Sequence, residues 1–102
     1  MTPAKVCEAA DKVVAMLRAF WPHGLEAVRH LDQADLTPRE RAEHLMHVCK
    51  SIGVLVAEGR REKAMRWLGF AQGAAWALMH VSVAELAEHN RPDLAEAPPP
   101  CA

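Results

Sequence analysis

The sharpest local signal in this sequence is the start of a helix at Thr37-Pro38-Arg39-Glu40. The Thr37 hydroxyl can accept a hydrogen bond from the amide of Glu40, and the Glu40 carboxylate can accept one from the amide of Thr37. Pro38 occupies the first helical position, where the backbone amide has no acceptor within the helix, so a proline removes no hydrogen bond. Apolar residues then recur at helical spacing up to Gly59, which suits the left-handed conformation that ends a helix. We predict one helix between these limits.

Three further segments carry helix signals. Thr2 and Pro3 form an N-cap and first turn, and apolar residues at helical spacing predict a helix from Pro3 to about residue 20. The spacing of Leu25, Val28 and Leu31 suggests a shorter second helix after the break at Pro22 and Gly24. A last short helix is expected from the cap at Ser82, where Glu85 stands three residues later, to about residue 88.

The segment of about residues 61–79 is apolar around most of a helical circumference, which predicts a helix contacted on more than one side. Gly69 and Gly73 lie four residues apart on one face of it, beside Phe70 and Trp76. Two glycines weaken an isolated helix, so they suggest a packing role. This face is expected to receive another helix of the same chain or to form the seam of a homo-oligomer.

The composition favours helices over strands. Ala, Leu, Met, Glu and Arg are abundant, while Tyr is absent from the 102 residues. We therefore predict an all-α fold, a compact bundle of four to five helices with the 61–79 helix at its centre. Residues 1–91 are expected to form one domain, and the proline-rich residues 92–102 a flexible, disordered tail.

The charge balance and the cysteines limit the partners and the compartment. Twelve basic residues face thirteen acidic ones, so the formal charge is −1 and binding to nucleic acid is not expected. We find neither a membrane-length apolar run nor a signal peptide in the sequence, which predicts a cytoplasmic protein. Cys7, Cys49 and Cys101 are odd in number and lack motif spacing, so we interpret them as reduced thiols.

The search for catalytic or metal-binding patterns yields only weak candidates. His44 and His47 are three residues apart on the helix that begins at Thr37, but no second ligand pair has suitable spacing. Cys7 and Cys49 lie within apolar stripes, where a thiol is normally inert. We find no matched acid and base pair among the carboxylates. The sequence therefore predicts no enzyme, no cofactor and no metal site.

A basic cluster is the strongest candidate for a ligand site. Arg60, Arg61, Lys63 and Arg66 surround the start of the 61–79 helix, and Trp67 stands beside them. Unpaired amides and the helix dipole favour anions there, guanidinium groups can hold a phosphate, and an indole can stack on a base. A nucleotide or a phosphorylated peptide fits this chemistry. The alternative is a solvated first turn, partly neutralised by neighbouring glutamates.

Part of the C-terminal half resembles small proteins encoded by tailed bacteriophages and prophages. The resemblance rests on the run Arg66-Trp-Leu-Gly-Phe-Ala-Gln-Gly73, on the capped segment that begins at Ser82, and on Asn90-Arg-Pro. In those proteins a glycine often stands near the turn that Met79 and His80 occupy here. The resemblance implies a phage accessory protein and supplies no catalytic residues.

These observations lead to three functional hypotheses. The first is a phage-type accessory protein that acts stoichiometrically by binding a host protein, for example to inhibit a bacterial defence or regulatory system. The second is an oligomeric sponge that sequesters a nucleotide signal through the basic cluster. A DNA-binding regulator is the third, and it is weakened by the near-neutral charge and the lack of a clear recognition helix.

Overall fold

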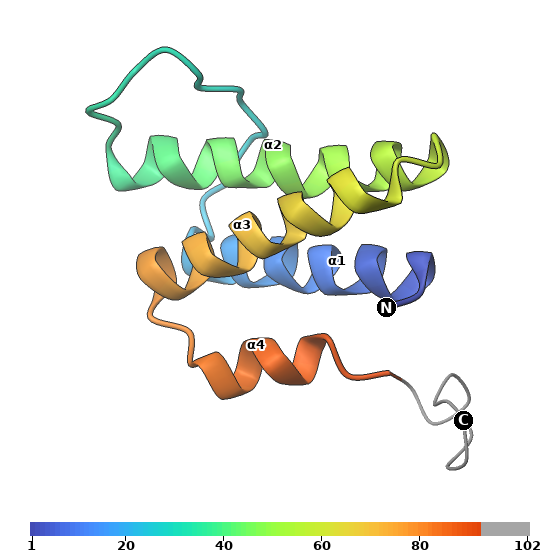
Figure 1. Cartoon of the computed structure of the whole chain (residues 1–102). Helices are drawn as coiled ribbons and strands as arrows, with labels where there is room; N and C mark the ends of the chain where they lie inside the picture. The colour runs from blue at the N-terminus through green and yellow to red at the C-terminus, as the bar shows by residue number, and fades with distance from the viewer. Residues whose placement is uncertain (93–102) are drawn as a thin grey trace, which may run out of the picture.

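A computed structural model of the chain describes residues 1–92 and contains four helices in that range. They are α1 (Pro3–Phe20), α2 (Pro38–Ala57), α3 (Arg61–Met79) and the short α4 (Val83–His89), arranged as in Figure 1. The predicted all-α bundle is confirmed. The tail expected at 92–102 lies, apart from its first residue, outside the described residues, as does Cys101.

The three long helices pack against one another around a single apolar core. Its largest fully buried side chains are Leu17, Leu45, Met46, Ile52, Val6 and Val13, which come from α1 and α2. The contribution of α3 consists mostly of small residues, with Ala64, Ala71 and Ala75 buried beside Leu68. Small side chains let helix backbones approach closely, so α3 sits near both other long helices.

The predicted helix ends are confirmed where local hydrogen bonds define them. The Thr37 hydroxyl accepts from the Glu40 amide at 3.1 Å, and the Glu40 carboxylate accepts from the Thr37 amide at 3.0 Å. Thr2 caps α1 by accepting from the amide of Lys5 at 3.1 Å. Gly59 has a φ of 76°, and its left-handed backbone turns the chain from α2 into α3.

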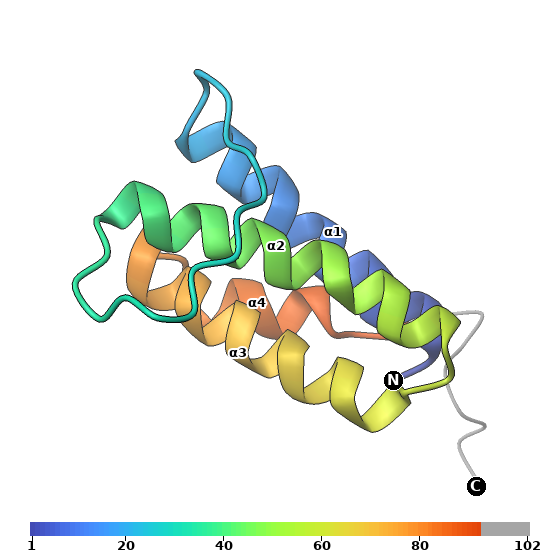
Figure 2. The same ribbon diagram turned by 90° about the horizontal axis from the view of Figure 1, so that it is seen from above.

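The helix expected around residues 25–31 is wrong, because residues 24–31 form no helix. The segment 21–37 crosses the outside of α2 in Figure 2 and finds its backbone partners there. The Val28 amide donates to the Glu43 carbonyl at 3.2 Å, and the His30 amide donates to His44 Nδ1 at 3.0 Å. These tertiary hydrogen bonds replace those that a helix would have made. Leu31, counted as part of an apolar stripe, is 61% exposed.

Helix α4 is held to the bundle by few contacts. Its one buried residue is Leu86, and it lies against α1. Two hydrogen bonds join Asn90, just beyond α4, to Gln72 of α3, at 2.7 and 3.0 Å. The turn before α4 contains His80 at a φ of 57°, a left-handed conformation that favours glycine.

Candidate functional site

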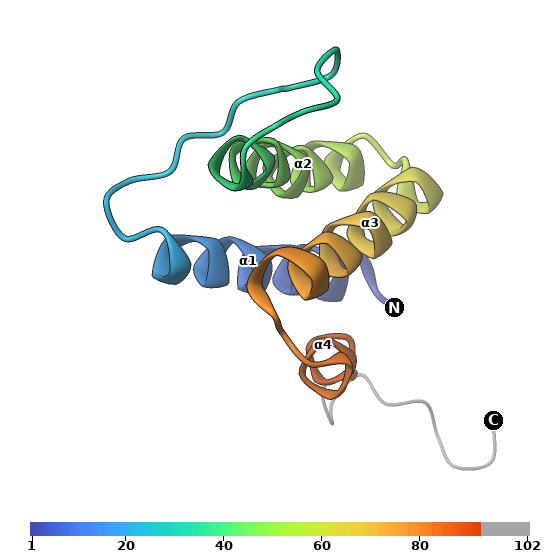
Figure 3. The ribbon, with the colours of Figure 1, turned by 90° about the vertical axis from the view of Figure 1, so that its left-hand side faces the viewer.

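One face of α3 is open to solvent, and we call it the open face. It includes Gly69 and Gly73, where an added Cβ would meet no atom within 4 Å, and the flanking Phe70 and Trp76, which are 56% and 55% exposed. Figures 2 and 3 show α3 at an edge of the bundle. Helix α3 does contact both α1 and α2, as expected of a central helix, but through its other side. The expectation that these glycines receive another helix of the same chain is therefore wrong; the seam between chains stays a prediction.

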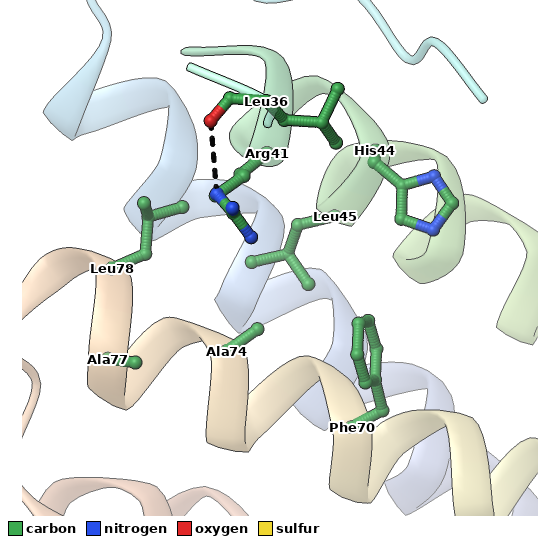
Figure 4. A pocket seen from close by; sticks show the side chains of 8 residues that line it. All are labelled: Leu36, Arg41, His44, Leu45, Phe70, Ala74, Ala77 and Leu78. Atoms are coloured by element: carbon green, nitrogen blue, oxygen red, sulfur yellow. Dashed lines mark hydrogen bonds between the residues drawn. The ribbon is translucent and has the colours of Figure 1, made fainter. Parts of the chain in front are cut away.

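A groove runs between α2 and α3 beside the open face. One part of it has a volume of about 310 Å³ and is shown in Figure 4. We call this part the α2–α3 groove; its lining residues are Leu36, Arg41, His44, Leu45, Phe70, Ala74, Ala77 and Leu78. Most of the lining is aliphatic or aromatic, and Arg41 and His44 supply the charged and polar groups. Such a surface suits an apolar side chain whose neighbours can hydrogen-bond to the rim.

A second hollow of about 230 Å³ continues along α2 and shares His44 and Phe70 with the groove. Trp67 and His47 also line it, together with Leu31 from the segment 21–37. The segment 21–37 thus helps to build the walls of both hollows, because it also contains Leu36.

His44 lies between the two hollows and is fixed by its hydrogen bond. The His30 amide donates to Nδ1 of His44, so this nitrogen is the acceptor when the imidazole is neutral. Burial, followed by the positive charges that His47, His30 and Arg29 can carry, lowers the pKa of His44 below its ordinary value of 6.5. His30 Nε2 lies 3.2 Å from Glu43 Oε1, which adds a further link between the segment 21–37 and α2.

The weak metal candidates gain no further ligand. The rings of His44 and His47 are 5.9 Å apart between centroids. Within residues 1–92, no three His, Cys, Asp or Glu side chains are grouped as a metal ion would require. Cys49 is buried, and burial raises the pKa of its thiol to about 12, with a smaller effect from Asp11. That thiol therefore stays protonated near neutral pH and acts as a small apolar side chain.

The structure divides the predicted basic cluster in two. Arg60, Arg61, Lys63 and Arg66 line a shallow hollow of about 390 Å³, to which Gly59 and Glu62 also contribute. Trp67 does not line this hollow and lies along the groove side instead, with Lys63 Nζ 5.2 Å from its ring centroid. Arg61 also donates a hydrogen bond to the Met1 carbonyl. Four of the five predicted residues are thus brought together, without the indole that was expected to stack on a base.

Leu36 and Arg41 are groove residues that the sequence prediction missed. Leu36 directly precedes the N-cap Thr37, and Arg41 follows at the fourth helical position, a pair of positions that often pack together at helix starts. Here the Arg41 Nε donates to the Leu36 carbonyl at 3.2 Å, as Figure 4 shows. That rule describes two apolar residues, and position 41 is an arginine, so the sequence carried no local signal for this pair or for α3 lying opposite it.

Comparison of the chain with protein-family models, with curated proteins and with solved structures gives no match. Among residues 1–92, no helix combines the length and apolar character needed to cross a membrane.

Proposed function

We propose that this chain is a stoichiometric binding protein and that the α2–α3 groove receives part of a protein partner. The observation that carries the proposal is the groove itself, an apolar hollow with Phe70 exposed at its edge. Concave apolar surfaces with a few polar groups at the rim are where proteins anchor a partner's side chains. The groove offers Arg41 for a carboxylate or carbonyl, and His44 as a second polar contact.

The resemblance to phage-encoded proteins suggests the kind of partner. A phage accessory protein acts in the bacterial cytoplasm, where a host protein is the natural target and cysteines stay reduced. In this proposal the chain blocks a surface of that protein, so its effect depends on stoichiometry and not on turnover. Inhibition of a defence or regulatory protein is the form of the hypothesis that we favour.

Quantitative capture from a bacterial host lysate tests the proposal. Leu36→Asp places a charge in the groove, whereas Val54→Asp changes a side chain that is 58% exposed on α2 and does not line the groove. We expect the parent and Val54→Asp to retain the same host protein in near-equal molar amounts and Leu36→Asp to lose it. Circular dichroism checks that all three are equally helical. Equal capture by all three, or no stoichiometric capture by the parent, would overturn the groove as the binding site.

A nucleotide sponge is the second candidate, and the hollow lined by Arg60, Arg61, Lys63 and Arg66 favours it. Helix α3 begins there without a side-chain cap, so its first amides remain open to an anion. In that case nucleotides raise the melting temperature, and salt or Arg61→Ala abolishes the shift. A melting temperature that nucleotides leave unchanged at low salt would eliminate the sponge.

A further inference from the structure

We propose that the open face of α3 binds the same face of a second copy of this chain, with the two α3 helices antiparallel. The proposal rests on the order of residues along the face, which meets the α2–α3 groove at Phe70. Leu36 and Arg41, which belong to that groove, come from outside α3.

The centre of the open face is a row of exposed residues three or four positions apart along α3. The row consists of Glu62, Arg66, Gly69, Gly73, Trp76 and His80. Residues at this spacing share one side of a helix. Exposed Met65 and Phe70 flank the row and add apolar surface to it. A row that is apolar in its middle and polar at its ends has the layout of a protein interface.

The row is complementary to the same row of a second copy whose α3 runs in the opposite direction. A two-fold axis at the level of Ala71 places each residue opposite the one equally far along the partner helix. Gly69 of each copy then faces Gly73 of the other. The two equivalent glycine pairs allow the helix backbones to approach closely. At about 1.5 Å per residue, Arg66 and Trp76 both lie about 7.5 Å from the axis and meet across it. That pair brings a guanidinium to an indole ring, a favourable contact.

The next pair outward can form a hydrogen bond between an imidazole and a carboxylate. Glu62 and the turn residue His80 each lie nine positions from Ala71, so the carboxylate of one copy meets the imidazole of the other. A parallel pair would instead place Arg66 against Arg66 and Glu62 against Glu62, which is unfavourable. The charges therefore select the antiparallel arrangement.

The surface beside Trp76 has room for the partner's side chains. A hollow of about 480 Å³ is lined by Trp76, Ala77, His80, Val81 and Ser82. In the antiparallel pair, Arg66 and Glu62 of the second copy reach this hollow, and the first copy fills the equivalent hollow in return. Another protein would have to match the same alternation of glycine, indole and charge by chance, whereas a second copy matches it by symmetry.

Sedimentation equilibrium of the full chain tests whether the pair forms. We expect a reversible monomer–dimer equilibrium, weakened at least tenfold by Gly73→Leu, because leucine separates the two backbones. Gly53→Leu is the matched control, since Gly53 is also exposed within a helix with no atom within 4 Å of an added Cβ, but lies on α2. A parent that is monomeric up to about millimolar concentration, or equal effects of the two substitutions, would overturn the proposal.

A charge exchange tests the antiparallel register. His80→Glu should weaken association about threefold to thirtyfold, because Glu62 of each copy then faces a glutamate. Adding Glu62→Lys to His80→Glu should restore association, and Glu62→Lys alone should not strengthen it. The two positions are about 27 Å apart along one helix, so coupling between them can arise only between copies. Independent effects of the two substitutions would exclude this register even if a dimer forms.

Discussion

The two sides of α3 differ in a way that its composition does not reveal. One side buries Ala64, Leu68, Ala71 and Ala75 against α1 and α2, and the other leaves Gly69, Phe70, Gly73 and Trp76 open. Two large aromatic residues, Phe70 and Trp76, are thus on the outer side, while alanines form much of the inner one. An amphipathic surface helix normally places its bulkiest apolar residues inward. A helix that is apolar on most sides can therefore pack into its own core with one side and leave the other side free to bind another molecule.

The largest expected effect separates the two sides directly. Leu68→Ala removes a side chain that is 3% exposed, so we expect a loss of about 2 to 5 kcal/mol in the free energy of unfolding. Phe70→Ala removes a larger side chain from the open side and should change this free energy by less than about 1 kcal/mol in dilute protein. Urea denaturation measures both. Similar losses for the two variants would show that Phe70 contributes to the monomer's stability as a core residue does.

A smaller effect of opposite sign is expected for the glycines. Gly73→Ala adds a better helix former at a site with free space, so dilute protein should gain up to about 1 kcal/mol in unfolding free energy. Gly53→Ala should give a similar gain on α2. The unfolding free energies of the two variants should diverge as the protein concentration rises, because only Gly73 lies on the face that we expect to associate. A loss of stability for Gly73→Ala in dilute protein would contradict the open position of this glycine.

The smallest effect is expected at the border of the open side, where His44 lines the α2–α3 groove. Its pKa is lowered on folding, so the neutral form is the one that the native state favours. The stability that it contributes is present in full above pH 6.5 and falls as the pH is lowered through and below that value, until the folded histidine is protonated too. Denaturation between pH 7.5 and 5 should show this decrease. In His44→Gln, the share of this decrease that His44 causes should disappear. An identical dependence of the unfolding free energy on pH in the parent and the variant would contradict this role of His44.

The sequence predicted well those features that depend on near neighbours. The starts of α1, α2 and α4 follow from Thr2, Thr37 and Ser82, each of which accepts from an amide three residues later. The end of α2 follows from Gly59 in the same way. Such signals act within one turn of chain and need no knowledge of the tertiary fold.

The features that were missed depend on contacts between distant residues. The spacing of Leu25, Val28 and Leu31 fits a helix, but Val28 and His30 donate to α2, and no local pattern reveals that competition. Similarly, the pattern of 61–79 could not show whether Gly73 would face its own chain or solvent. The groove combines Leu36 with Ala74 and Leu78, a juxtaposition that exists only once α2 and α3 are packed.

The sparse attachment of α4 has a consequence for how the protein fluctuates. Leu86 is its only buried residue, and the two hydrogen bonds between Gln72 and Asn90 are a further link. Detaching α4 therefore exposes little apolar surface, while the core shared by α1, α2 and α3 keeps its own contacts. A segment of this kind opens at a free-energy cost well below that of global unfolding. We therefore expect hydrogen exchange to find the backbone amides of α4 less protected than those of the core shared by α1, α2 and α3.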